Sequence, residues 1–299
     1  MSDGEGHART TALAHVRVVS GAIRCQLGEG PSWDGRRNQV YWVDILAPAL
    51  HRLNVADGAL LSWRLPENIG WVIPRAGRDT FIAGLRSGFA EIALEPFAIR
   101  TFGRIPELVG NGRLRMNDAK ADSRGRIFAG VMDMDGVETG NLYRLDSEQS
   151  WAVVDSGYGI PNGPTFSPSG DVMYHADTKR RLVYQFTVGA DGNLSNKRPF
   201  VAFPEQWGVP DGMTADADGG VWIAHWGGSR VSRFTPAGAL DRAIHLPTPQ
   251  ITSCVFCGPG LRRMYVTSAA LGMEGDPLAG ALFEVDPGCQ GIEAHAFAG

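Results

Sequence analysis

The sequence predicts an all-β protein, a six-bladed β-propeller with four-stranded blades around a central channel. Three observations support this fold class. Short β-rich runs behind turn signals recur along the whole chain. No long amphipathic helical stripe with caps at both ends is present. The 39 glycines and 18 prolines among 299 residues suit many short strands, because glycine supplies positive φ at turns and proline avoids central strands.

Each recurring run has a polar or glycine-bearing turn followed by β-branched or aromatic residues, as a strand leaving a hairpin should. The clearest six runs are Tyr41–Asp44, Phe81–Leu85, Ile127–Gly130, Val172–Ala176, Val221–His225 and Met264–Ser268. They lie about 40 to 49 residues apart, which is the period of a propeller blade. Further strands fit between them, around Leu53, Tyr143, Tyr184, Val231 and Phe283.

The period also predicts the domain organisation. Residues 1–13 are interpreted as a flexible tail and residues 14–299 as one propeller domain, because a blade cannot bury both faces unless neighbours stack on it. Residues His15–Val19 are expected to close the ring by pairing with strands from the C-terminal region. A β-sandwich or two smaller β domains would not explain a period sustained over the whole chain, and no linker-like stretch separates two domains.

Composition narrows the function classes. The formal net charge is -4, without the basic surplus of a nucleic-acid binder. No run of about 18 apolar residues predicts a transmembrane helix, and the N-terminal residues lack the apolar core of a signal peptide. The cysteines are Cys25, Cys254, Cys257 and Cys289. They are too few for a disulfide scaffold, which favours a cytoplasmic location. The lone Cys254-x-x-Cys257 pair is interpreted as two buried small residues rather than a zinc or redox site.

Polar residues recur at one phase of the period. Counting back about 11 to 13 residues from the aromatic residue of four of these strands reaches Glu29, Asn117, Asn162 and Asp211. In the two remaining blades the count reaches Ile69–Gly70 and Thr252–Ser253. Equal phase means equivalent positions about the axis. The four side chains should therefore converge at one mouth of the channel.

Converging oxygen donors without Cys or His favour a hard cation, Ca²⁺, Mg²⁺ or Mn²⁺. Two buried carboxylates would be costly unless a cation or a proton compensated them. The alternative is that these residues only cap turns, because Asn-Gly and Asp-Gly are ordinary turn dipeptides. Four such residues in phase favour a shared metal site.

At these residues the chain resembles the senescence marker protein / gluconolactonase / luciferin-regenerating enzyme family. The resemblance covers nearly the whole chain, and its strongest matches include RMNDAKADSRGRIFAG, GIPNGPTFSPSG and VPDGMTADADGGVWIAHWGG. It implies the same six-bladed fold with one divalent metal ion bound by Glu29, Asn162 and Asp211. Ca²⁺ is the favoured ion, with Mg²⁺, Mn²⁺ or Zn²⁺ as the other candidates.

The resemblance also implies substrate contacts. Arg115 and Asn117 match the family's substrate-contacting arginine and asparagine, and Asp118 matches the aspartate that follows them. In VMDMDG, Asp135 matches the acidic residue that meets substrate hydroxyls, with Asp133 as the alternative.

Members of this family hydrolyse aldonolactones and related cyclic esters, so the resemblance implies a lactonase whose partner is a small-molecule lactone. Asp211 would act as the general base for the attacking water, while the ion polarises the carbonyl. Two other hypotheses stay open. The same site could hydrolyse an aromatic lactone or a phosphotriester, or the chain could be a calcium-binding regulatory propeller without turnover.

Two histidines offer a competing chemistry. His175 and His225 lie on strands one blade apart. A serine-based triad would also need a nucleophile, and the sequence contains no G-x-S-x-G elbow. Both histidines are therefore interpreted as packed or channel-lining residues.

Overall fold

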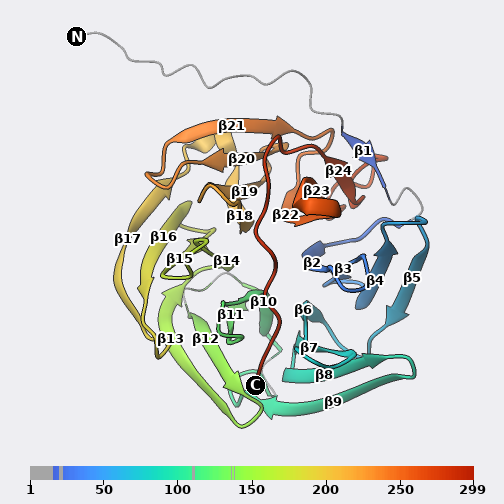
Figure 1. Cartoon of the computed structure of the whole chain (residues 1–299), viewed down its shortest axis with the longest axis vertical. Helices are drawn as coiled ribbons and strands as arrows, with labels where there is room; N and C mark the ends of the chain where they lie inside the picture. Colours follow the sequence, from blue (N-terminus) through green and yellow to red (C-terminus); the bar gives the residue numbers. More distant parts are fainter. Residues whose placement is uncertain (1–15, 20–22, 110–111, 136, 138) are drawn as a thin grey trace.

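The chain forms a ring of six β-sheets (Figure 1). The computed structural model describes residues 16–19, 23–109, 112–135, 137 and 139–299. Within these ranges every sheet has four antiparallel strands, and the sheets stand side by side like the blades of a propeller. The predicted six-bladed propeller is therefore confirmed. The predicted tail, residues 1–13, lies outside the described residues.

The first strand of each sequential blade lies nearest the axis, and the following strands lie progressively further out. Blades 1 to 3 comprise β2 Gly28–Asp34, β3 Gln39–Asp44, β4 Ala49–Asn54 and β5 Leu60–Arg64; β6 Ile69–Pro74, β7 Thr80–Leu85, β8 Gly88–Leu94 and β9 Phe97–Arg104; β10 Leu114–Ala121, β11 Ile127–Asp133, β12 Gly140–Ser147 and β13 Ser150–Tyr158. Blades 4 and 5 comprise β14 Pro161–Phe166, β15 Val172–Asp177, β16 Leu182–Val188 and β17 Leu194–Ala202; β18 Val209–Ala215, β19 Val221–Trp226, β20 Arg230–Phe234 and β21 Leu240–His245. Blade 6 comprises β22 Ile251–Cys257, β23 Arg263–Ser268, β24 Phe283–Val285 and β1 Arg17–Val18.

The six runs that carried the predicted period are the second strands of the six blades, β3, β7, β11, β15, β19 and β23. The intervening predicted strands are also present, as β4, β12, β16, β20 and β24. The ring closes as expected, because β1 pairs with β24 through Arg17 opposite Glu284 and Val18 opposite Phe283. The N-terminal strand thus completes the last blade.

All six inner strands are interrupted at the same place. Pairing with the second strand shifts register between Glu29 and Ser32 in β2, and equivalent shifts occur in β6, β10, β14, β18 and β22. Such a bulge leaves residues unpaired and changes the direction of their side chains. These residues are therefore released from the usual alternation of strand faces, at the end of the channel where the polar residues lie.

The hydrophobic core lies between neighbouring blades. Trp222 of blade 5 packs edge-on against Phe256 of blade 6, with 6.2 Å between ring centroids, and Phe128 of blade 3 packs against Phe166 of blade 4 at 5.5 Å. Burial of such aromatic side chains between blades is the main stabilising contribution that holds the ring together.

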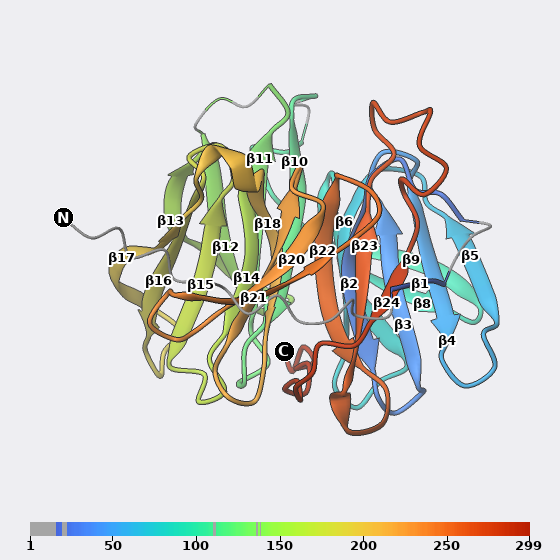
Figure 2. The same ribbon diagram turned by 90° about the horizontal axis from the view of Figure 1, so that it is seen from above.

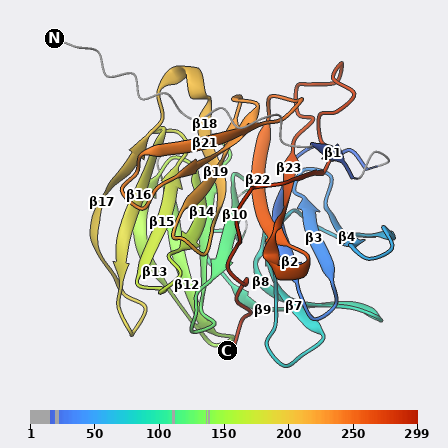
Figure 3. The ribbon, with the colours of Figure 1, turned by 45° about the horizontal axis from the view of Figure 1, so that its top comes forward.

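The C-terminal segment, residues 286–299, runs across the ring from blade 6 toward blades 2 and 3 (Figures 1 and 3). Its backbone bonds to blade 5 through Ala217 N–H to the Gln290 oxygen and to blade 2 through Phe297 N–H to the Pro74 oxygen, at 2.8 and 2.9 Å. Phe297 is fully buried. The segment therefore fastens together blades that are not neighbours in the ring.

Seen from above, the strands run between two sets of loops (Figure 2). Neither of the two short 3₁₀ helices in the described ranges, Glu205–Trp207 and Pro259–Leu261, has the length or apolar character needed to traverse a bilayer.

Candidate functional site

A cluster of buried polar side chains lies at the bulged ends of four inner strands. We call this cluster the hub, and it contains Glu29 of β2, Arg115, Asn117 and Asp118 of β10, Asn162 of β14 and Asp211 of β18. Each of these residues exposes no more than 7% of its surface. Charged groups are rarely buried to this extent unless they are paired or hold an ion.

Glu29 and Asp211 form the acidic part of the hub. Their carboxyl groups are joined by a hydrogen bond, although the two residues lie 182 positions apart in the sequence. Burial raises the pKa of Glu29 to about 8, and the charge of Asp118 adds to the shift. Burial also raises the pKa of Asp211 well above its usual range, with further contributions from Glu29 and Asp118. Without a cation, the two groups therefore retain a shared proton near neutral pH.

Asn162 presents an amide oxygen whose direction is fixed by two neighbours. Its Oδ1 accepts a hydrogen bond from Asn117 Nδ2 at 2.7 Å, and its Nδ2 donates to Thr178 Oγ1 at 2.8 Å. Thr178 in turn donates to the Pro210 carbonyl oxygen at 2.6 Å. This chain links blades 3, 4 and 5 and places Asn162 and the residue preceding Asp211 in one network.

Arg115 connects the amide part of the hub with the acidic part. Its Nη1 donates to Asn117 Oδ1 at 2.7 Å and to the Met116 oxygen at 3.0 Å. Burial lowers the pKa of Arg115 to about 10, while the nearby charges of Glu29 and Asp211 oppose that shift. The guanidinium therefore remains positively charged near neutral pH.

Asn117 has little free hydrogen-bonding capacity. It donates to the Pro161 oxygen at 2.8 Å as well as to Asn162, and its Oδ1 accepts from Arg115. Both N–H groups are thus committed, which leaves one lone pair on Oδ1 for a further donor.

Asp118 binds backbone rather than other side chains of the hub. One oxygen accepts from Ala119 N–H at 2.7 Å and the other from Gly163 N–H at 3.1 Å. Gly163 follows Asn162 directly and has a φ of 74°, a conformation that glycine adopts without strain. Asp118 therefore holds the bulge that presents Asn162.

The inner strands approach one another too closely for larger residues at some hub positions. A Cβ atom on Gly212, the residue after Asp211, would lie 2.2 Å from Ser253 Oγ and 2.9 Å from the Thr252 oxygen. The glycine in the sequence VPDGMTAD is thus needed because β18 packs closely against blade 6 at this position.

Asp135 differs from the hub residues because it is exposed. Its side chain is 64% exposed and pairs with Arg113 Nε at 2.9 Å. Asp133 is buried, accepts the Asp135 N–H at 2.8 Å and also pairs with Arg113. Asp133 therefore stabilises the turn, and Asp135 is the more accessible of the two carboxylates.

The remaining candidates are packed residues. His175 and His225 have no exposed surface, and burial lowers the pKa of each to about 3. His175 packs edge-on against Tyr158, with 4.7 Å between ring centroids. Cys254 and Cys257 are free, fully buried thiols, and burial raises the pKa of Cys254 to about 12. These features match the predicted packing roles.

The donor set of the hub fits a hard divalent cation. Glu29, Asp211 and Asn162 offer oxygen atoms only, which Ca²⁺ and Mg²⁺ prefer. The hydrogen-bonded carboxyl pair is itself a place where positive charge is required, because a proton now bridges what would otherwise be two buried anions. Among the described residues, no three Asp, Glu, His or Cys side chains are grouped closely enough to share an ion. The candidate set is therefore two carboxylates and one amide, without Asp118.

Sequence reasoning missed Thr178 and Arg113. Thr178 stands directly after the second strand of blade 4, and its bonds to Asn162 and Pro210 connect two blades. Arg113 holds the turn that carries Asp135. Neither has a distinctive local motif, and only the folded structure shows what they contact.

Comparison with known proteins agrees with this architecture. A family model described as the SMP-30/Gluconolactonase/LRE-like region matches residues 27–270. Pentonolactonase XacC of Haloferax volcanii is 35% identical, over 92% of this chain and 95% of the relative. L-arabinolactonase of Azospirillum brasilense is 33% identical, over 92% of this chain and 93% of the relative.

The solved structure of a luciferin-regenerating enzyme superimposes with a TM-score of 0.89 and 28% identity, covering 95% of this chain and 99% of that one. The matched region contains the whole hub, from Glu29 to Asp211. The chain belongs to the SMP-30/gluconolactonase/LRE-like family of six-bladed β-propellers.

Proposed function

We propose that this chain is a metal-dependent hydrolase that opens a small cyclic ester, most specifically a sugar acid lactone. The observation that carries the proposal is the buried Glu29–Asp211 carboxyl pair, which shares a hydrogen bond. Asn162, whose amide is fixed by Asn117, is linked through Thr178 to Pro210, the residue before Asp211. Two relatives at about a third identity are named as lactonases of pentono- and arabinolactones, which supports this substrate class.

Glu29, Asn162 and Asp211 would hold the divalent cation, with Ca²⁺ as the favoured ion. When bound, the ion supplies Lewis-acid polarisation of the ester carbonyl and stabilises negative charge on its oxygen. The network through Asn117 and Thr178 holds the amide of Asn162 in one orientation. Little reorganisation is then needed on binding, which favours affinity.

Asp211 is the proposed general base. Lactone opening needs a water molecule that loses a proton as it attacks the carbonyl carbon, and a carboxylate at the site can accept that proton. Asp211 is buried in the hub, and a bound cation would favour its ionised form, which is the form that can accept a proton. Glu29, whose Oε2 accepts the Gly30 N–H at 2.9 Å, would serve mainly as a ligand.

Arg115 is the proposed donor to oxygen atoms of the substrate. Its guanidinium is cationic, buried and oriented by Asn117. Its remaining N–H groups are therefore preorganised to donate hydrogen bonds to ring or hydroxyl oxygens. Asn117 would accept a hydrogen bond from one substrate hydroxyl through Oδ1. Asp135 would accept a hydrogen bond from an outer hydroxyl of a polyol substrate, because its exposed carboxylate keeps acceptor sites beyond the ion pair of Oδ2 with Arg113.

The test is lactone hydrolysis by EDTA-treated protein, followed with a pH indicator. Pentono-, hexono- and aromatic lactones are each tried with added Ca²⁺, Mg²⁺, Mn²⁺ and Zn²⁺. We expect turnover of sugar lactones that EDTA removes and one or more of the ions restores. Preferential turnover of aromatic lactones, or metal binding without any turnover, would contradict the proposed substrate class or activity.

Single substitutions separate the roles of the two carboxyl groups. Asp211→Asn should nearly abolish turnover while the circular dichroism spectrum stays that of the wild type. Asp57→Asn, which changes the same group in the exposed turn between β4 and β5, is the matched control and should keep full activity. A normal rate for the Asp211 variant would remove this residue from the mechanism.

A further inference from the structure

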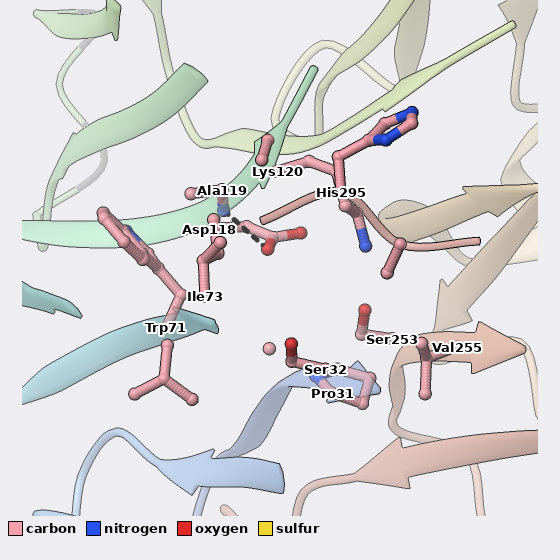
Figure 4. A pocket seen from close by; sticks show the side chains of 14 residues that line it. Pro31, Ser32, Trp71, Ile73, Asp118, Ala119, Lys120, Ser253, Val255 and His295 are labelled. Carbon is pink, nitrogen blue, oxygen red and sulfur yellow. Dashed lines mark hydrogen bonds between the residues drawn. The ribbon is translucent and has the colours of Figure 1, made fainter. Parts of the chain in front are cut away.

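Lys120 places a second positive charge close enough to act on Asp118 of the hub. It lies on β10 three residues after Asn117, and it lines a small cavity in the central channel together with Asp118, Ser32 and Ser253 (Figure 4). The cavity has a volume of about 20 Å³, enough for about one water molecule. Ala294 of the C-terminal segment also lines this cavity. Lys120, which is half-buried, therefore borders a space that is too small for a larger ligand.

The ammonium group has no direct partner in the described part of the chain. No carboxylate lies within the 4.0 Å of an ion pair, and no hydrogen bond to Lys120 Nζ is formed by those residues. Its charge nevertheless acts on the hub. Burial raises the pKa of Asp118 to about 6, and the charge of Lys120 is the largest effect that opposes this shift.

The charges of the hub explain why a lysine in the channel matters. Glu29, Asp118 and Asp211 contribute three negative charges when ionised, and Arg115 contributes one positive charge. A divalent cation would bring this set to neutrality. With Lys120 included, the occupied hub carries one net positive charge.

We propose that Lys120 is a positioning residue that acts through Asp118 and keeps the cation-loaded hub net positive, which weakens cation binding but favours the negative charge that develops on the substrate. This inference rests on the proposed function. In a poorly solvated channel the positive charge of Lys120 acts over several ångströms. Direct contact of Lys120 with the cation or the lactone is therefore not required.

A purely structural role for Lys120 predicts the opposite result for metal affinity. If its side chain only fills the channel, replacement would loosen the hub and weaken cation binding. If its charge is what matters, an uncharged side chain of similar length would strengthen cation binding. The sign of the change in Kd therefore distinguishes the two roles.

The experiment is calorimetric titration of CaCl₂ into full-length, EDTA-treated protein, comparing wild type with Lys120→Met. We expect the Kd for Ca²⁺ to fall by at least roughly fivefold and kcat for the lactone to fall, with little change in KM. Lys120→Arg keeps the positive charge, so its Kd for Ca²⁺ and its kcat should be close to those of the wild type. Lys197→Met removes the same charge from the outer strand β17 and should leave the Kd for Ca²⁺ unchanged.

An unchanged or higher Kd for Ca²⁺ in Lys120→Met would overturn the inference. Should that variant not fold, Lys120→Gln repeats the comparison with a polar side chain in the channel. Wild-type protein that binds Ca²⁺ but shows no lactonase activity would contradict the proposed function while the Kd ratio still tests Lys120. Wild-type protein that binds no divalent cation would overturn both.

Discussion

Replacing Glu29 with glutamine should stabilise the metal-free protein. The carboxyl of Glu29 is buried and bonded to Asp211, and burial together with the charge of Asp118 raises its pKa from 4.5 to about 8. Glutamine is isosteric, keeps an acceptor for the Gly30 N–H, which now bonds Glu29 Oε2 at 2.9 Å, and carries no charge. The substitution therefore removes an electrostatic penalty while preserving the local packing.

The size of this effect follows from proton linkage. A carboxyl group whose folded-state pKa is raised is protonated in the folded protein and ionised in the unfolded chain between pH 4.5 and 8, so it destabilises the fold increasingly as pH rises through this range. One pH unit corresponds to about 1.36 kcal/mol. The penalty removed by glutamine is then about 3 kcal/mol at pH 7 and about 1 kcal/mol at pH 5.

The assay is urea denaturation in EDTA at pH 5 and pH 7, followed by tryptophan fluorescence. We expect the free energy of unfolding of Glu29→Gln to exceed that of the wild type, with a larger difference at pH 7. In the presence of Ca²⁺ the order should reverse, because the wild type gains binding energy that the variant has lost. A variant that is no more stable than the wild type in EDTA at pH 7 would refute the account of a proton-sharing carboxyl pair.

Three further predictions concern the surroundings of the site. Thr178→Val should cost about 1–3 kcal/mol of stability and weaken Ca²⁺ binding, because it leaves Asn162 Nδ2 and the Pro210 oxygen without their present partner; denaturation and calorimetry equal to those of the wild type would contradict this. Phe297→Ala should lower the free energy of unfolding by about 3–5 kcal/mol, since the ring is fully buried. Val18→Ala, at a 37% exposed position, is the control and should cost little. A loss below about 1 kcal/mol for Phe297→Ala would show that the C-terminal segment is not needed for stability. Burial lowers the pKa of His175 from 6.5 to about 3, so the unfolded chain takes up a proton at a higher pH than the folded protein does. The wild type should therefore lose stability as pH falls from about 6.5 toward 3, and His175→Leu should reduce that loss. If the free energy of unfolding fell with pH equally steeply in both proteins, the buried imidazole would not be neutral.

The propeller was predictable because each of its units is signalled locally. The hairpin turn and the aromatic strand after it, as in Val221–His225, are contiguous in sequence and recur with one period. Repetition then predicts the ring, because equivalent units stack in equivalent ways. Pairing of the N-terminal strand with the last blade also followed, since a ring has no other place for it.

The hub was only partly accessible from sequence. Equal phase predicted that Glu29, Asn162 and Asp211 share one end of the channel, and they do lie on the inner strands at that end. Phase could not predict which groups bond to one another. The contacts Glu29 to Asp211 and Asn117 to Asn162 depend on strand bulges and on distances across the axis, which no local pattern encodes.

The sequence by itself determined the number of blades and the order of their strands, because these depend on turn chemistry within short segments and on the period at which those segments recur. Tertiary structure alone decided that Thr178 bonds both Asn162 and Pro210 of the next blade, that Arg113 engages Asp135, and that Lys120 and Asp118 line one small cavity with Ser32 and Ser253 of other blades. Those relations arise between residues from different strands, and in part from different blades. Hydrogen bonds and electrostatic effects depend there on separations of a few ångströms that the chain acquires only on folding.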